Sequence, residues 1–126
     1  MSEKAKIFIV DDDPLLAEML SDHLTDELFA DVSLFATGEA ALAKIKTEPD
    51  LIILDYHLNS REKDAANGVD ILKEIKAQNK SLPVIMLSSQ ESYATASQSI
   101  MYGAIHYVIK GKEAFDEVSK IAKANI

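Results

Sequence analysis

Short apolar runs alternate with helical patterns along the whole chain, and this alternation most limits the fold. The runs at residues 51–54 and 84–87 are apolar at every position, which is typical of strands buried on both faces of a sheet. The expected strands are 6–10, 32–35, 51–54, 84–87 and 105–109. A helical pattern follows each strand, and only the connection after the third strand is long. The sequence therefore predicts an α/β fold, with five βα units forming a doubly wound, five-stranded parallel sheet.

Residues typical of helix ends mark the helical segments. Asp13 and Pro14 open the first helix as its N-cap and first helical residue, and Thr37 caps the second. Gly103 is a natural C-terminal residue for the fourth helix. The last three helices are expected at about 68–78, 91–102 and 112–124. The side chains of Met19, Met86 and Met101 are assigned to packing.

Length and composition favour a single soluble domain. The chain has 126 residues, so we expect one domain over residues 1–126. There is no cysteine, which excludes disulfides, thiolate metal sites and cysteine nucleophiles. No apolar run approaches the roughly 20 residues of a membrane span or forms a signal-peptide core, so we expect a cytoplasmic protein without membrane contact. Acidic residues outnumber basic ones 21 to 13, and the net charge of −8 disfavours direct binding to nucleic acids.

Residues with acidic, hydroxyl or ammonium side chains stand at the ends of four of the predicted strands. They are Asp11, Asp12 and Asp13 after the first strand, Asp55 after the third, Ser88 and Ser89 at the fourth, and Lys110 after the fifth. Ligands of such sheets bind beyond the carboxyl ends of the strands. Two carboxylates about 4 Å apart repel by roughly 4 kcal/mol at an effective dielectric of about 20, so this cluster needs cations. Lys110 is one, and Mg²⁺ suits the oxygen ligands best.

Four motifs are together similar to the receiver domains of bacterial two-component response regulators. They are Ile9-Val10-Asp11-Asp12-Asp13-Pro14, Leu54-Asp55, Met86-Leu87-Ser88-Ser89 and Tyr107-Val108-Ile109-Lys110. Their order and spacing match over essentially the whole chain. The resemblance implies a flavodoxin-like or CheY-like sheet with strand order 2-1-3-4-5. It also implies a phosphoacceptor in two-component signalling, which promotes its own phosphorylation and dephosphorylation without being a conventional enzyme.

The resemblance implies a role for each residue of the acceptor site. Asp55 would be the phosphoacceptor, and Lys110 would pair with it once it is phosphorylated. Mg²⁺ would be bound directly by Asp12, Asp55 and the backbone carbonyl of His57, and through a water molecule by Asp11. Positioning and charge stabilisation are what phosphoryl transfer requires of a protein, so the residues fit the chemistry.

The resemblance also implies a switch and partners. Ser88 would be the switch hydroxyl, and the ring orientation of Tyr107 would report the switch. A sensor histidine kinase or a histidine phosphotransfer protein would donate the phosphoryl group. The helix at 91–102, the strand at 105–109 and the helix at 112–124 would offer a surface to a downstream protein. Because Glu91 is the only charged residue of that first helix, we expect a largely monomeric domain.

Several positions depart from the family pattern or invite another interpretation. Asn59 and Gly111 stand where the family often has proline, and the stretch from Tyr56 to Asn67 is about five residues longer than usual. His57 occupies a variable position of the active loop. The other histidines, at positions 23 and 106, are assigned to the surface.

Three other functions are compared with the receiver. A haloacid-dehalogenase-type phosphatase would use Asp11 as its nucleophile but needs a larger domain or cap. A flavodoxin-like protein would bind phosphate after the first strand, where three carboxylates repel it. A receiver-like interaction module that is never phosphorylated is the most serious alternative. The chain ends soon after the last helix, so we expect no output domain within it; a stand-alone receiver and a piece of a longer protein both remain open.

Overall fold

Five parallel strands form one sheet in the order β2-β1-β3-β4-β5 in the computed structural model, which describes residues 4–58, 67–89 and 92–126. The strands are β1 (Lys6–Val10), β2 (Asp31–Phe35), β3 (Leu51–Asp55), β4 (Val84–Ser88) and β5 (His106–Ile109). The helices are α1 (Pro14–Leu28), α2 (Gly38–Leu42), the 3₁₀ helix η1 (Ile45–Thr47), α3 (Gly68–Gln78), α4 (Tyr93–Met101) and α5 (Ala114–Asn125). The predicted fold class and strand order are confirmed.

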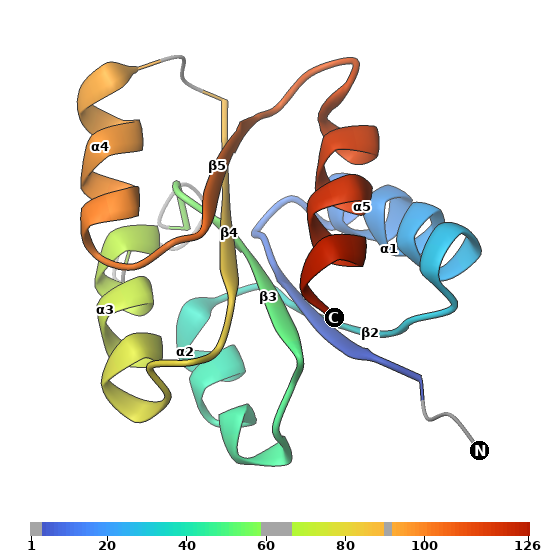
Figure 1. The fold of residues 1–126 in the computed structure, drawn as a ribbon, viewed down its shortest axis with the longest axis horizontal. Coiled ribbons are helices and arrows are strands. Elements are labelled where there is room, and N and C mark those ends of the chain that lie inside the picture. The colour runs from blue at the N-terminus through green and yellow to red at the C-terminus, as the bar shows by residue number, and fades with distance from the viewer. Residues whose placement is uncertain (1–3, 59–66, 90–91) are drawn as a thin grey trace.

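Helices cover both faces of the sheet, and each face has its own core. Figure 1 shows α1 and α5 on one side and α2, α3 and α4 on the other. Successive strand residues point to opposite faces, so Ile53 packs toward α1 and α5 while its neighbour Leu54 packs toward α2 and α3. Every residue of β3 and β4 is buried, as the uninterrupted apolar runs predict. These two strands form the protected centre of the molecule.

The helix boundaries follow from local capping, and some differ from the expected ranges. Asp13 and Thr37 cap α1 and α2 as predicted, because their side-chain oxygens accept backbone N–H groups of the first turn. α2 ends at Leu42, and η1 then carries Ile45 into the core. α4 begins at Tyr93 after its N-cap Ser92.

Gly103 follows α4 with a φ of +110°, a conformation that glycine adopts readily. The long connection after β3 falls mainly in residues 59–66, outside the described residues, and so does Asn59.

Two of the three methionine assignments were wrong. Met86 is fully buried, whereas the side chains of Met19 and Met101 are 52% and 71% exposed. The buried stripe of α1 runs through Ala17, Leu20 and Leu24, and Met19 lies beside it. Within the described residues, no helix combines the length and the apolar character needed to cross a membrane.

Candidate functional site

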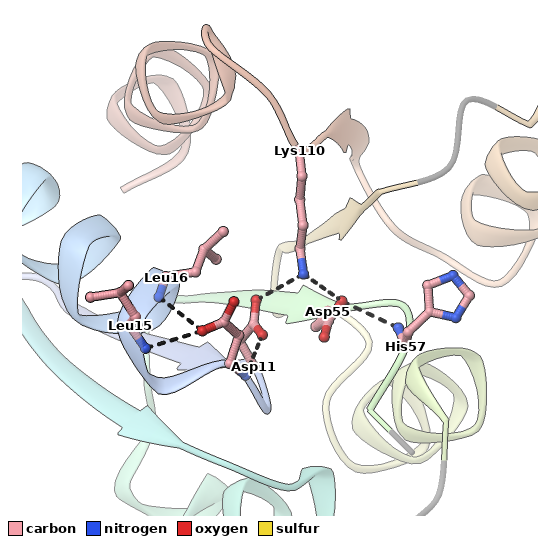
Figure 2. A network of polar contacts seen from close by, with 7 residues as sticks. Asp11, Leu15, Leu16, Asp55, His57 and Lys110 are labelled. Atoms are coloured by element: carbon pink, nitrogen blue, oxygen red, sulfur yellow. Dashed lines mark hydrogen bonds and ion pairs between the residues drawn. The ribbon is translucent and has the colours of Figure 1, made fainter. Parts of the chain in front are cut away.

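Three carboxylates and one ammonium group meet at the carboxyl end of the sheet. Asp11 and Asp12 directly follow β1, Asp55 ends β3, and Lys110 directly follows β5. Asp11 and Asp55 are 3% and 2% exposed. The Nζ atom of Lys110 lies 3.3 Å from Oδ2 of Asp11 and 3.2 Å from Oδ1 of Asp55 (Figure 2). The structure thus brings together side chains that are far apart in the chain.

Strand register and a tight turn place the first two carboxylates. Val10 is paired with Leu54 between β1 and β3, so the residues that follow, Asp11 and Asp55, leave the sheet side by side. Oδ1 of Asp11 accepts the backbone N–H of Asp13 at 2.9 Å. Asp13 in turn accepts two N–H groups at the start of α1, so the aspartate run forms a turn that is fixed by the helix.

The turn after Asp55 is held from several sides. The N–H of Tyr56 donates to the carbonyl oxygen of Leu87 in β4 at 2.9 Å, and the N–H of Gly68 in α3 donates to the carbonyl oxygen of Tyr56 at 3.0 Å. The N–H of His57 donates to Oδ1 of Asp55 at 3.2 Å (Figure 2). The hydroxyl group of Tyr56 donates to Oε1 of Gln98 in α4 at 3.3 Å. The end of β3 is therefore connected to both α3 and α4.

Burial and charge act in opposite directions on the carboxylate of Asp55. Burial, together with repulsion from Asp11, raises the pKa of Asp55 from 3.8 to about 7, although Lys110 and the His57 N–H favour its charged form. Burial acts to lower the pKa of Lys110, but attraction by Asp55 and Asp11 outweighs it and raises that pKa above 10.5. The positive charge of Lys110 alone does not compensate the negative charges of the site.

The three carboxylates fit a divalent cation. Asp11, Asp12 and Asp55 each offer an oxygen, and these oxygens lie within 4.8 Å of one another. Oδ2 of Asp12 is buried and accepts no hydrogen bond from residues 4–58, 67–89 or 92–126. A buried carboxylate oxygen needs a partner, and hard cations such as Mg²⁺ prefer such oxygens. The donor set therefore suits Mg²⁺.

The residues predicted to form the switch lie on the two neighbouring strands. Ser88 ends β4 and is fully buried. Tyr107 is paired with Met86 in the β4–β5 register, and its ring packs against the core on the α2–α3 face. Because Met86 and Ser88 are two residues apart in one strand, Ser88 and Tyr107 share that face of the sheet.

Sequence reasoning missed several side-chain contacts. The ring of His57 packs against that of Tyr56, with centroids 4.9 Å apart. His106 is exposed as predicted, but His23 is only partly exposed and its Nε2 lies 3.4 Å from Oδ1 of Asp116. The links of Tyr56 to α3 and α4 join residues distant in the chain, and no local pattern in the sequence reveals them.

Comparisons with known proteins agree with this geometry. Residues 7–122 match the family described as the response regulator receiver domain. The DNA-binding response regulator MtrA of Mycolicibacterium smegmatis is 31% identical over 119 residues, which are 94% of this chain and 49% of that protein. The probable C4-dicarboxylate response regulator DctR of Bacillus subtilis is 32% identical over 83% of this chain and 45% of that protein. The chain thus spans about half the length of these relatives.

Solved structures of similar chains have the same fold. The receiver domain of NtrX from Brucella abortus is 30% identical with a TM-score of 0.83, covering 94% of this chain and 96% of that chain. A CheY-like response regulator receiver domain protein from Methanospirillum hungatei is 26% identical with a TM-score of 0.83, covering 97% of this chain and 94% of that chain.

Proposed function

This chain belongs to the response regulator receiver domain family, and on that premise we propose that residues 1–126 form one receiver domain in which Asp55 accepts a phosphoryl group in a Mg²⁺-dependent reaction. The observation that supports this most is the position of Asp55. Its carboxylate is almost fully buried at the end of β3, 3.2 Å from Nζ of Lys110 and within 4.8 Å of two further carboxylates. This arrangement stabilises anionic oxygens.

The proposed reaction requires little covalent chemistry from the protein. A carboxylate oxygen of Asp55 attacks phosphorus, the bond between phosphorus and the donor breaks, and the donor leaves with the bonding electron pair and takes up a proton. Lys110 stabilises the charge on the equatorial oxygens, and the His57 N–H holds the carboxylate in place. A cation held by Asp11, Asp12, Asp55 and the carbonyl of His57 would neutralise the clustered charge. Because burial raises the pKa of Asp55, that neutralisation also favours the reactive carboxylate form.

Receiver domains of response regulators interact with histidine kinases, and we assign the donor to this class. A sensor histidine kinase or a histidine phosphotransfer protein would supply the phosphoryl group in the cytoplasm. The surface formed by α4, β5 and α5 is the proposed contact for a downstream protein. On α4 and β5 it exposes Tyr93, Ile100, Met101 and Ile109. Because the net charge is −8, we propose that the domain itself does not bind nucleic acid. Because Glu91 is the only charged residue at positions 91–102, we also propose that the domain is monomeric, which light scattering before and after phosphorylation tests.

Phosphorylation with a small-molecule donor tests the function directly. The protein is incubated with Mg²⁺ and acetyl phosphate, and the modified residue is mapped by mass spectrometry after reduction of the acyl phosphate. We expect modification at Asp55, no modification without Mg²⁺, and none in Asp55→Asn, whose fold stays intact. Modification at Asp11 would instead support the phosphatase-like alternative. A folded protein that takes up no phosphoryl group from acetyl phosphate or from histidine kinases would support the interaction module.

A further inference from the structure

Gly68, the first residue of α3, lies directly against the backbone of the proposed acceptor. A Cβ atom at this position would overlap the carbonyl oxygen of Asp55, and would lie 2.7 Å from Cα of Tyr56 and 2.9 Å from its carbonyl oxygen. All three atoms belong to the backbone, so no side-chain rotation can relieve the overlap. Among the described glycines only Gly103 has a positive φ, so space and not backbone conformation requires glycine at position 68.

The contact is anchored on both sides. Asn67 caps α3 by accepting the N–H of Asp70 at 3.0 Å, and Val69, Ile71 and Leu72 bury the first turns of the helix. On the other side, the N–H of Tyr56 is bonded to the carbonyl oxygen of Leu87 in β4. The backbone at residues 55–56 is therefore enclosed between β4 and the start of α3, and it cannot move away without breaking one of these attachments.

We propose that Gly68 is a positioning residue for the acceptor: its missing side chain lets α3 set the position of the turn at residues 55–57. The N–H of Gly68 donates to the carbonyl oxygen of Tyr56, which fixes the turn from the helix side. The same turn supplies the His57 N–H to the Asp55 carboxylate, and that carboxylate must stay 3.2 Å from Nζ of Lys110. This inference rests on the proposed function, because it assigns a role in phosphoryl uptake. A displacement of about 1 Å at a reacting group can slow a reaction up to roughly 100-fold.

Gly38 provides a matched control within the same chain. A Cβ atom at Gly38 would overlap Cγ1 and Cδ1 of Ile71 and lie 2.9 Å from its Cγ2. Gly38→Ala therefore makes the same chemical change at the start of another helix, and it also overpacks α3. Its three nearest atoms all belong to the buried, β-branched side chain of Ile71, whereas those of Gly68→Ala all belong to the backbone of the proposed acceptor.

The test compares Gly38→Ala and Gly68→Ala with wild type, at a temperature where circular dichroism shows all three folded. Phosphorylation rates are measured with saturating acetyl phosphate and Mg²⁺, and amide chemical shifts are measured by NMR without either. We expect Gly38→Ala to react within about twofold of wild type and Gly68→Ala to react roughly tenfold more slowly or worse. In Gly68→Ala the amide shifts of Asp55, Tyr56 and His57 should move, and in Gly38→Ala they should not.

The outcomes separate this inference from the proposed function. Equal rates for the two variants, or unmoved amides at residues 55–57 in Gly68→Ala, overturn the positioning role. If wild type takes up no phosphoryl group, the proposed function fails, and the amide shifts alone decide whether Gly68 positions the turn. If Gly68→Ala does not fold, both changes are made in Asp55→Asn, which relieves the charge repulsion, and the same amide comparison decides.

Discussion

At Asp55, the folded and unfolded states bind protons differently. In the folded, metal-free protein, burial and the charge of Asp11 raise the pKa of Asp55 to about 7, against 3.8 in the unfolded chain. Between these values the folded state holds the extra proton, so this residue stabilises the fold at low pH. The contribution is lost as the pH rises toward 7. The carboxylate that the proposed reaction needs is thus costly to keep charged.

The first prediction follows from this titration. Wild type in EDTA should lose stability from pH 5 to pH 8 relative to Asp55→Asn, which has no charge to bury. At pH 8 the variant should be more stable by on the order of 2–4 kcal/mol. Urea unfolding of both proteins at four pH values measures the difference. Parallel pH profiles would show that Asp55 does not titrate in this range.

The second prediction separates the two carboxylates after β1. Oδ1 of Asp11 accepts the Asp13 N–H and its Oδ2 faces Lys110, whereas Oδ2 of Asp12 is buried and lacks a hydrogen-bond donor among the described residues. Asp12→Ala should therefore weaken Mg²⁺ binding more than Asp11→Ala, by roughly tenfold or more relative to wild type. Calorimetric titration measures this, with Asp13→Ala as a control that removes a neighbouring charge and the helix cap. Equal losses for Asp11 and Asp12 would contradict the assignment.

At the scale of elements, β4 and β5 carry the predicted switch. Ser88 is fully buried, and it shares a face of the sheet with Tyr107. A phosphoryl group adds strong acceptors beside the end of β4, and a hydroxyl group that turns toward them leaves space behind it for the ring.

The third prediction is that Ser88→Ala uncouples the two events. Asp55 should still accept phosphate, more slowly, while the NMR signals of the Tyr107 ring no longer change on phosphorylation. Wild type is the reference. A ring that keeps one orientation in all states of wild type would mean that the protein does not signal through Tyr107.

The fourth prediction concerns the link between β3 and α4. The hydroxyl group of Tyr56, the residue after Asp55, donates to Oε1 of Gln98 at 3.3 Å. A double-mutant cycle of Tyr56→Phe and Gln98→Ala should give a coupling free energy of about 0.5–1.5 kcal/mol in urea unfolding. Additive effects of the two changes would show that the hydrogen bond does not form in solution.

The observed strands and helices also show which parts of this structure local sequence patterns predict. Strand positions were predicted within one residue at each end, because alternating and uninterrupted apolar runs depend only on burial. The starts of α4 and α5 were less accurate, since Ser92 and Ala114 are not marked by glycine or proline. The convergence of the aspartates and Lys110 was predictable from strand order. The contacts of Gly68 and Tyr56 were not, because they depend on how α3 and α4 lie against the end of β3.

For the whole molecule, metal binding and folding are linked. The carboxylates converge only in the folded state, so Mg²⁺ should bind that state preferentially and stabilise it. The fifth prediction is that Mg²⁺ at about 100 times its Kd stabilises the protein by about 2.7 kcal/mol and raises Tm by on the order of 5–10 °C. Differential scanning calorimetry measures the shift. It should shrink strongly in Asp12→Ala but persist in Gly38→Ala, and an equal shift in both variants would place the cation elsewhere.

The complete burial of β3 has a consequence for how the domain fluctuates. Amide hydrogens of a strand with strands on both sides and helices on both faces exchange with solvent only through global opening, whereas exposed helices exchange through local fraying. We therefore expect the amides of residues 52–54 to be among the slowest in the protein and those of α4 to exchange far faster. Asp55 is attached to the slowest segment, so local opening of the surface around it need not displace this proposed acceptor. Rapid motion of α4 in the proposed partner surface is then compatible with a stationary Asp55.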